Sequence, residues 1–394
     1  MHAISIEEIR NFRLRSHHLD RWYDRTEVEA VVGGCGMQNS PPGVWEAALA
    51  NRIAACDGQW IERLLTEERT LLQAWSIRGV PLVFPVSGSH LFLSSLVAEE
   101  GERWIYTRGA SWALEELGMG IEEALSLVER VMPNLDGETI VGKAALDRRI
   151  AGWVEGLLSP TLQAIWQQKS IYDPRGNQSL GEALVSFLLR PLSSKGLVVF
   201  AQRHGQEPSF TSYRTWVGKG IELVPPPQTT LVETFLHSYG PATVRHFASW
   251  LGCSPQQASR LWNEGHDRME AVTVSTQRRY MLTQDVPALL NPRPLGRSTH
   301  LLAAHDPYLG LQDRAVICPH TEHQRIIWQT VANPGAIVHE GEIVGYWKSR
   351  KRAHVLDMEL VVWEGAQLKG DALIPLAQHH AHVRGCTLGT LVIT

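Results

Sequence analysis

The stretch that decides the fold runs from Thr229 to Thr283 and reads TTLVETFLHSYGPATVRHFASWLGCSPQQASRLWNEGHDRMEAVTVSTQRRYMLT. Its apolar spacing and its turn residues predict three helices, the third capped by Ser254, and then a β-hairpin that turns near Ser275. These elements are expected at residues 229–238, 243–250, 254–263 and 272–283. A helix-turn-helix followed by a β-hairpin is the order of a winged helix, which presents its second helix to DNA.

Two further segments repeat this order of elements. In the middle of the chain, a helix over residues 179–194 ends at Gly196, and two strands follow around a turn at residues 204–206. Near the N-terminus, the same reasoning predicts helices over residues 6–16, 25–32 and 42–54, followed by a strand region over residues 75–87. The repeated order predicts related domains in tandem.

The remaining segments complete the expected organisation. From His300 onward the sequence is β-rich, with paired strands around Gly345–Trp347 and Val355–Trp363. The segment VPPPQTT, Val224–Thr230, contains three consecutive prolines and is expected to be a stiff linker. The sequence therefore predicts an α+β fold of tandem winged-helix domains with a β-rich C-terminal part. The expected domain bounds are residues 1–134, 135–224, 225–290 and 291–394.

Composition limits the classes of protein that the chain can belong to. The 394 residues are 44% apolar and carry a formal net charge of −4, so contact with nucleic acid would require local basic patches. The five cysteines are widely spaced without a CxxC pair, which argues against a disulfide framework and a zinc site. The N-terminus lacks the apolar core of a signal peptide, and no stretch approaches about 20 apolar residues. We expect a cytoplasmic, nucleoid-associated protein without a membrane segment.

One uncharged polar cluster, Gln38-Asn39-Ser40, stands between a glycine-rich turn and a new helix. Pro41 and Pro42 can open that helix, and apolar residues then recur at helical spacing. The cluster is therefore expected at an exposed helix start. Its plainest role is to satisfy the backbone amides that every helix leaves unpaired at its N-terminus.

Four motifs together resemble the AlkZ-like family of winged-helix bacterial DNA glycosylases. That family carries Gln-x-Gln or Gln-x-Asp before such a helix, and here the motif reads Gln38-Asn39-Ser40. The strand with Arg-Gly-Thr reads Arg78-Gly79-Val80, and the C-terminal part contains Asp306-Pro307-Tyr308 and Gly345-Tyr346-Trp347. The resemblance implies a C-shaped, monomeric DNA-repair enzyme that acts on alkylated purines and interstrand crosslinks in double-stranded DNA, with neither metal nor organic cofactor.

The resemblance assigns the water-positioning role of the family motif to Gln38 and Ser40. A glutamine amide oxygen can accept a hydrogen bond from the attacking water, and this suffices mainly when a cationic base already leaves easily. Ser40 replaces the second Gln or Asp with a shorter hydroxyl, so the water needs another partner. Asp306 is the best carboxylate to compensate for Ser40. Equally, Asp306 could orient His305, receive a charge from the motif region, or cap a turn.

Basic side chains form local clusters that could contact DNA. The run KSRKR, Lys348–Arg352, is expected at a hairpin tip that enters a groove or follows phosphates. Arg78 is either a phosphate contact or one half of a structural ion pair. The individual candidates for DNA contact are Arg78, Arg203, His204, Arg260, Arg278, Arg279, Lys348, Arg350, Lys351 and Arg352. His379, His380 and His382 have no acidic or cysteine neighbour in the sequence, so we expect no metal site there.

Two other functions fit the same sequence. In a non-catalytic DNA-binding protein, such as a lesion sensor or regulator, the winged helices would remain and Ser40 would mark the lost reaction. Binding that depends on salt but not on the lesion would favour this alternative. Acidic winged-helix chains can also bind proteins, an interpretation that fails if reversing the charges of Lys348–Arg352 abolishes DNA binding.

Overall fold

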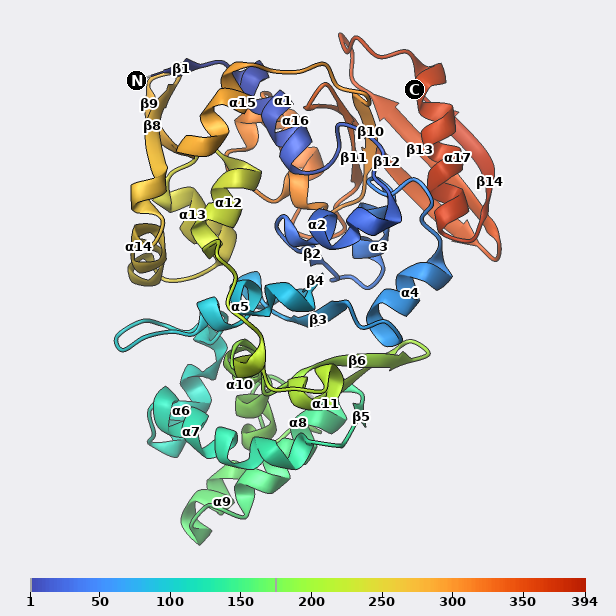
Figure 1. The fold of residues 1–394 in the computed structure, drawn as a ribbon. Coiled ribbons are helices and arrows are strands. Elements are labelled where there is room, and N and C mark those ends of the chain that lie inside the picture. The colour runs from blue at the N-terminus through green and yellow to red at the C-terminus, as the bar shows by residue number, and fades with distance from the viewer. Residues whose placement is uncertain (1, 174–175) are drawn as a thin grey trace. The chain divides into compact units, whose positions relative to one another are not determined.

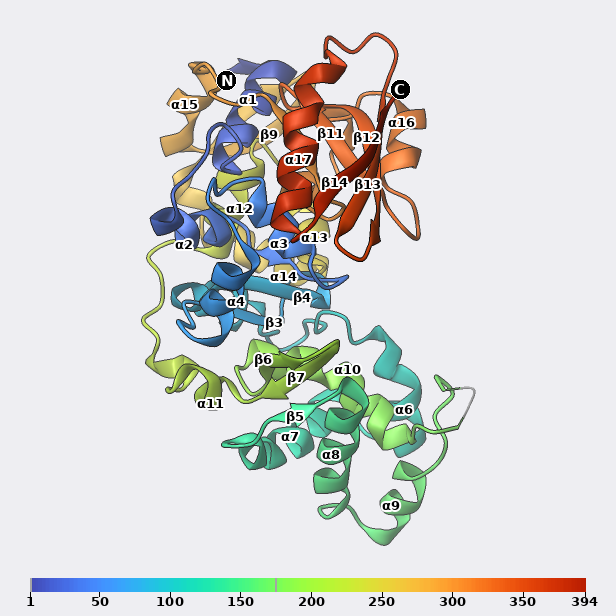
Figure 2. The same ribbon diagram turned by 90° about the vertical axis from the view of Figure 1, so that its right-hand side faces the viewer.

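The structure, a computed structural model, describes residues 2–173 and 176–394 and shows a mixed α+β fold. The chain divides into two compact units. Unit 1 contains the chain up to Leu64, Thr229–Trp250 and Ala258–Thr394, and unit 2 contains Leu65–Gln228 and Leu251–Gln257. The chain passes from unit 2 back to unit 1 between Gln228 and Thr229. This boundary lies in the expected triproline linker. Figures 1 and 2 show the elements of each unit in two views.

The largest sheet of unit 1 is built from the C-terminal part of the chain. Its strands lie in the order β10-β11-β12-β13-β14, antiparallel except for the parallel pair β13 and β14. Helix α17 packs on the sheet, as Figure 1 shows in red, through a core that includes Leu356, Leu360 and Ala377. These elements are β10 (Thr299–Leu302), β11 (Gly335–His339), β12 (Glu342–Arg352), β13 (Val355–Val362), α17 (Ile374–Val383) and β14 (Thr387–Ile393). The β-rich C-terminal part is therefore confirmed.

Three helices and a hairpin follow the triproline linker as the sequence predicts. The helices are α12 (Leu231–Tyr239), α13 (Val244–Leu251) and α14 (Pro255–Asn263), and the hairpin consists of β8 (Met269–Val274) and β9 (Gln277–Leu282). The Ser254 hydroxyl accepts a hydrogen bond from the Gln257 amide at 3.2 Å, which confirms it as the cap of α14. Strand β1 (Ala3–Ile4) pairs in parallel with β8 and joins the N-terminus to this hairpin.

The N-terminal elements of unit 1 differ from expectation in length. Helix α1 (Ile6–Ser16) has the predicted bounds because Ser5 and Glu8 form a capping box. The expected helix 25–32 is a 3-10 turn followed by α2 (Val28–Gly33). The expected helix 42–54 is shortened to α3 (Val44–Ala50), because Gly43 has a left-handed φ of 94° directly before it. Pro41 and Pro42 therefore belong to a turn.

Unit 2 is mainly helical. Its core is centred on α10 (Leu180–Ser194), whose Leu184 and Leu188 are fully buried and whose N-terminus is capped by Ser179 and Glu182. The helix and the following hairpin confirm the expected elements of the middle segment. The strands are β5 (Ile140–Val141), β6 (Val199–His204) and β7 (Glu207–Thr211) in the order β5-β7-β6, and the antiparallel pair β3 (Leu71–Trp75) and β4 (Pro81–Pro85).

Shorter helices complete both units. In unit 2 they are α5 (Ser89–Phe92), α6 (Ser111–Leu117), α7 (Ile121–Val131), α8 (Lys143–Glu155), α9 (Pro160–Trp166) and α11 (Tyr213–Val217). The remaining elements are β2 (Met37–Gln38), α4 (Gly58–Thr66), α15 (Val286–Leu290) and α16 (Thr321–Ile327). In the part of the chain that the structure describes, no helix has the length and apolar character that crossing a membrane requires.

Candidate functional site

The motif glutamine lies at the end of strand β2 with its side-chain amide held in one orientation. Gln38 Nε2 donates to the backbone oxygen of Ser40 at 2.7 Å. A carbonyl oxygen can only accept, so the nitrogen of the Gln38 amide must face Ser40. The amide oxygen, Oε1, is therefore the atom on the opposite side of the group. Gln38 is partly buried, which limits the number of rotamers that it can adopt.

The spacer residue of the motif has a structural role. Asn39 is 6% exposed, and its Oδ1 accepts a hydrogen bond from the Gly43 amide at 2.8 Å, directly before α3. The bond holds the turn before α3 but pairs none of the first-turn amides of the helix, which has no side-chain cap among the described residues. The expectation that the cluster is exposed is wrong at this residue, because the Asn39 side chain turns inward to reach the Gly43 amide. Ser40 is partly buried, and among the described residues its hydroxyl makes no hydrogen bond.

A buried ion pair fixes the segment that follows α3. Both guanidinium ends of Arg52 donate to the carboxylate of Asp306, with Nη1–Oδ2 and Nη2–Oδ1 distances of 2.9 Å. The two side chains are 1% and 0% exposed. Arg52 also donates to the backbone oxygens of His17 and Ala48 at 2.8 and 2.7 Å. Burial opposes the charged form of Arg52, but the Asp306 carboxylate outweighs it, so the pKa of Arg52 is raised.

Asp306 performs two of the roles that the sequence left open. It receives the charge of Arg52, and its Oδ1 also accepts from the Tyr308 amide at 3.0 Å, which caps the short turn at Pro307–Leu309. Both carboxylate oxygens are thus engaged in bonds that hold the chain. Its compensation for Ser40 in catalysis stays a prediction. The ion pair points to an additional role, in which Asp306 positions α3 and the motif ahead of it.

A second buried carboxylate determines where Arg279 lies. Asp313 accepts from Arg13 at 3.1 and 2.9 Å and from Arg279 at 2.9 Å, so two guanidinium groups share one acid. Arg279 is 8% exposed. It joins hairpin β8–β9 to α1 in this conformation, so contact with a phosphate would require the ion pair with Asp313 to open. Its hairpin neighbour Arg278 is exposed and lies over Tyr280, with 5.3 Å between the guanidinium carbon and the ring centre.

The motif region also rests on buried histidines that sequence reasoning missed. His17 is 3% exposed and packs edge-on against Tyr239 and Tyr308, with ring centres 4.8 and 5.5 Å apart. Its Nδ1 lies 3.9 Å from the Cys35 sulfur. Burial, with a smaller contribution from Arg52, lowers the pKa of His17 well below its usual 6.5. Burial also raises the pKa of Cys35 to about 11, although the positive charge of Arg52 acts against this rise. Both groups are therefore neutral at pH 7.

Acidification is expected to destabilise unit 1 because its buried histidines resist protonation. Burial lowers the pKa of His380 from 6.5 to about 3 and that of His18 to about 4. The unfolded chain therefore binds these protons first, and stability is present above about pH 6.5 and lost as the pH falls toward the folded values. At pH 5, each group would lower the free energy of unfolding by about 2 kcal/mol. Urea unfolding at several pH values measures this dependence.

A single substitution separates this effect from general acid sensitivity. His380 is 7% exposed, packs edge-on against Trp347 at 4.6 Å, and has no hydrogen-bond partner for Nε2 among the described residues. We expect His380→Leu to remove one of the protons that the chain takes up on unfolding in acid. The free energy of unfolding should therefore depend less steeply on pH in this variant. An identical pH dependence in this variant and in the wild-type protein would contradict the assignment.

The basic run lies on the β12–β13 hairpin, as predicted. Arg350 faces Asp357 across the strands, Arg352 forms an ion pair with Asp357, and Ala353 turns the chain with a φ of 49°. Lys348, Arg350, Lys351 and Arg352 are all exposed. Sequence reasoning missed one member of this surface: exposed Arg384, beyond α17, donates to Ser349 at 3.4 Å. No local signal could reveal it, because β14 brings this segment back beside β13.

The other predicted DNA contacts are distributed over both units. In unit 1, Arg260 lies on α14 and pairs with Glu264 at 3.6 Å. In unit 2, Arg203 and His204 are exposed at the end of β6, and Arg203 donates to the Gln206 backbone. Arg78 lies in the turn between β3 and β4 with a left-handed φ of 58° and is partly buried. Within unit 1, the structure links Asp306 to the motif helix through Arg52.

The histidine cluster on α17 is engaged in packing. His379 bonds the Ala50 oxygen at 2.9 Å and packs edge-on against Trp22, with ring centres 5.0 Å apart. Among residues 2–173 and 176–394, no group of three His, Cys, Asp or Glu side chains is placed to hold a metal ion. The five cysteines, Cys35, Cys56, Cys253, Cys318 and Cys386, are free thiols.

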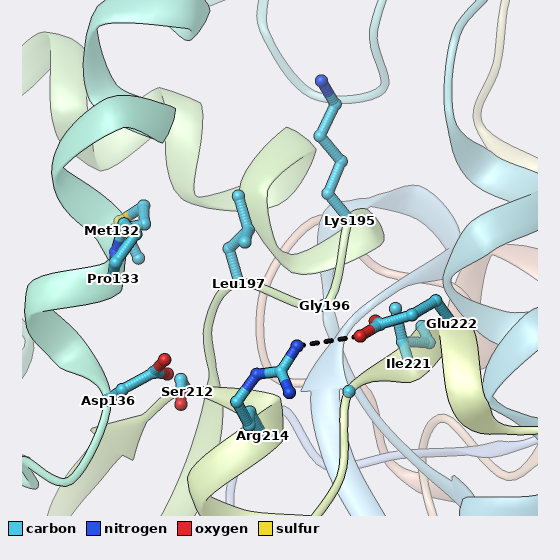
Figure 3. A pocket seen from close by; sticks show the side chains of 11 residues that line it. Met132, Pro133, Asp136, Lys195, Gly196, Leu197, Ser212, Arg214, Ile221 and Glu222 are labelled. Atoms are coloured by element: carbon cyan, nitrogen blue, oxygen red, sulfur yellow. Dashed lines mark hydrogen bonds and ion pairs between the residues drawn. The ribbon is translucent and has the colours of Figure 1, made fainter.

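A pocket in unit 2 lies apart from the predicted residues. Figure 3 shows Asp136, Lys195, Arg214 and Glu222 around it, with an Arg214–Glu222 ion pair of 2.8 Å. Lys195 is itself paired with Glu129. The charges that border the pocket are thus largely matched within the protein.

Comparisons with known proteins give a consistent result. The family model described as DNA glycosylase AlkZ-like matches residues 32–378. A relative from Streptomyces sahachiroi, an interstrand DNA cross-link repair glycosylase, is 26% identical over 355 residues, covering 86% of this chain and 85% of the relative. The solved structure of the Streptomyces sahachiroi DNA glycosylase AlkZ matches with a TM-score of 0.74 at 21% identity, covering 100% of both chains. That likeness shows a shared mixed α+β fold over the full length.

Proposed function

The chain belongs to the AlkZ-like DNA glycosylase family, and from this premise we propose that it is a monofunctional glycosylase. Its substrates in this proposal are cationic alkylated or crosslinked purines in double-stranded DNA. The observation that carries the proposal is the fixed amide of Gln38, whose nitrogen bonds Ser40 at 2.7 Å and whose oxygen is turned the other way. The relative that repairs interstrand crosslinks supports the choice of substrate class.

The reaction requires little from the protein when the base is cationic. Water forms a bond to the sugar C1′, the C1′–N bond breaks, and its electron pair stays with the base and cancels the positive charge. The water loses a proton to solvent. An amide oxygen at Gln38 accepts a hydrogen bond from the attacking water and orients one of its lone pairs. The site needs no lysine for Schiff-base chemistry and no metal in this proposal.

Ser40 and Asp306 act with Gln38 in different ways. The Ser40 hydroxyl makes no hydrogen bond among the described residues, so it can donate to the same water over a shorter reach than Gln or Asp. Asp306 contributes as a carboxylate near the motif, directly or through Arg52, which it holds at 2.9 Å. Buried charges in that pair keep the segment after α3 in one place.

Binding of double-stranded DNA is proposed to use winged helices and the basic hairpin. The order α12, α13, α14 and hairpin β8–β9 supports the winged-helix interpretation of the third segment. Tandem winged helices in a C-shaped monomer, with the domain bounds given above, would place DNA along one side. The candidate contacts in this proposal are Arg78, Arg203, His204, Arg260, Arg278, Arg279, Lys348, Arg350, Lys351 and Arg352. Such a protein would act inside the cell, on the nucleoid.

Removing three of the basic charges on the hairpin is expected to weaken DNA binding and its salt dependence. Asp357 neutralises part of Arg352, so we choose the triple variant Lys348→Ala, Arg350→Ala and Lys351→Ala. Each lost phosphate contact lowers the slope of log K against log salt by about 0.9, so the slope should fall by about 2 to 3. Fluorescence anisotropy from 50 to 200 mM salt measures both quantities.

A triple variant with the same loss of charge serves as the control. Arg130, Arg148 and Arg149 are exposed on α7 and α8, and their replacement by alanine should leave the salt slope unchanged. Equal weakening by both triple variants would mean that only net charge matters and that the hairpin is not the contact.

Incubation with damaged DNA tests the proposed function. Duplex DNA containing N7-methylguanine is treated with the protein and then with alkali, which cleaves the strand at abasic sites. Cleavage at the modified base is expected. The alternative, a non-catalytic lesion sensor or regulator, is favoured by Ser40 in place of the second motif residue. Salt-dependent DNA binding without any abasic product would establish that alternative instead.

A further inference from the structure

The loop RWIYTR, Arg103–Arg108, presents one aromatic ring between two arginines in unit 2. Tyr106 is 53% exposed, whereas its neighbours Ile105 and Thr107 are 7% and 4% exposed. Arg103 and Arg108 are exposed, and among the described residues neither has an ion-pair partner. The side chains of Ile105 and Thr107 are therefore buried, while one aromatic ring and two cationic side chains of the same loop are exposed to solvent.

Hydrogen bonds hold the loop in place. Trp104 is 4% exposed, and its indole nitrogen donates to Glu122 Oε1 at 2.8 Å. The Thr107 hydroxyl donates back to the Trp104 oxygen at 2.9 Å, across the exposed residue. Tyr106 is thus anchored on both sides. An aromatic side chain on such a loop loses little conformational freedom when it binds a ligand.

The backbone at this point is strained. Tyr106 has a left-handed φ of 63°, a conformation that glycine adopts easily and tyrosine rarely. It packs against the β3–β4 turn, where Arg78 and Gly79 also have left-handed φ angles of 58° and 69°. A Cβ atom on Gly79 would lie 2.5 Å from the Cβ of Tyr106, so only glycine admits this contact. Two strained non-glycine residues at one contact are a frequent sign of a functional site.

Arg190 supports the inner side of the ring. Its guanidinium carbon lies 4.6 Å from the centre of the Tyr106 ring and 5.2 Å from that of Trp75. The side chain is held by the Ser186 and Gly79 oxygens at 2.7 and 3.4 Å. A cation beneath the ring is stabilising and keeps the ring in place. More than half of Tyr106 remains available to a second stacking partner.

We propose that Tyr106 stacks on DNA bases at a gap in the base stack, and that Arg103 and Arg108 bind the phosphates beside it. The proposal rests on the proposed function, because an enzyme that acts on a base must gain access to an atom inside the duplex. Aromatic or apolar side chains commonly fill the space that an unstacked base leaves. Arg78, already a candidate phosphate contact, directly precedes Gly79, which packs against the Cβ of Tyr106.

Acidic residues beside the loop determine which binding measurement can test this proposal. Glu99, Glu100 and Glu102 directly precede the loop, and their charges oppose those of Arg103 and Arg108. Overall affinity is therefore a poor test of this site. The neutral ring should instead give a preference for DNA with a gap over intact DNA.

The test uses two duplexes that differ in one position. One contains a tetrahydrofuran abasic analogue beside 2-aminopurine, and the other has a normal nucleotide there. The wild-type protein is expected to bind the first more tightly and to quench its 2-aminopurine emission. Tyr106→Ala should reduce the preference about tenfold and abolish the quenching, with little change for the intact duplex. Tyr106→Phe should retain both properties, because stacking uses the ring.

Two controls keep the result interpretable. Tyr106→Leu still covers Gly79 and Arg190 but lacks a planar ring, so it should behave like Tyr106→Ala without loss of fold. Leu223→Ala removes an apolar side chain that is 61% exposed elsewhere in unit 2 and should change neither property. If folded Tyr106→Ala and Tyr106→Leu keep the preference and the quenching, the inference is wrong while the proposed function stands. A wild-type protein that binds neither duplex overturns both.

Discussion

Replacing Gln38 with alanine is expected to lower the single-turnover rate of N7-methylguanine release by about 100- to 1,000-fold. The substitution removes the amide oxygen that orients the water and also the 2.7 Å bond to the Ser40 oxygen that orients the amide. DNA binding should change little, because the hairpin and the other basic residues are intact. Measurement at saturating enzyme, with alkaline cleavage of the abasic product, isolates the chemical step.

Other variants distinguish this role from general damage to unit 1. Gln59→Ala removes an exposed glutamine from α4 and should leave the rate unchanged. Ser40→Ala should lower the rate by less than about tenfold, because it removes one neutral hydrogen-bonding group. Ser40→Gln, which restores the Gln-x-Gln pattern of the family, is expected to raise the rate. A rate for Gln38→Ala that equals the wild-type rate would exclude Gln38 from the reaction.

Breaking the Arg52–Asp306 pair should cause the largest loss of stability. Asp306→Asn leaves a buried guanidinium without its counter-charge, and Arg52→Met leaves a buried carboxylate in the same position. Removing one partner of a buried ion pair costs about 3 to 5 kcal/mol, because the remaining charge stays desolvated. Urea unfolding followed by tryptophan fluorescence measures the free energy of unfolding.

The double variant and an exposed pair provide the comparison. Arg52→Met combined with Asp306→Asn should recover part of the lost stability, since neither buried group is then charged. Arg21 and Glu27 form a 2.7 Å pair with side chains 51% and 35% exposed, so Arg21→Met should cost less than about 1 kcal/mol. Equal effects of Asp306→Asn and Arg21→Met would mean that burial of the first pair has no energetic consequence.

Local signals in the sequence explain what could be predicted of the fold. Capping residues such as Ser5 and Ser179 lie beside the helices they start, so the bounds of α1 and α10 follow from short-range chemistry. Helix α3 was predicted too long because the left-handed backbone at Gly43 excludes Pro41 and Pro42 from it. Turn conformations of this kind depend on the surrounding packing as well as on residue type.

The candidate site was less predictable, because its contacts join distant segments. Arg52 and Asp306 are 254 positions apart, and no local pattern connects them. The same applies to Arg279, whose burial against Asp313 cannot be read from a hairpin that otherwise has the composition of a surface element. The loop RWIYTR is different, since an aromatic residue between arginines is a readable signal for nucleic-acid contact that the sequence reasoning passed over.

The division of the chain also has a consequence during synthesis. Unit 1 joins the first 64 residues to segments that begin at Thr229, so unit 2 emerges from the ribosome before unit 1 can close. At typical elongation rates, Asp306 is synthesised roughly 10 to 50 s after Arg52. Through that interval the guanidinium stays hydrated and α3 lacks its clamp. In a nascent chain arrested before residue 306, unit 2 should therefore resist protease, whereas the N-terminal segment of unit 1 should still be cleaved.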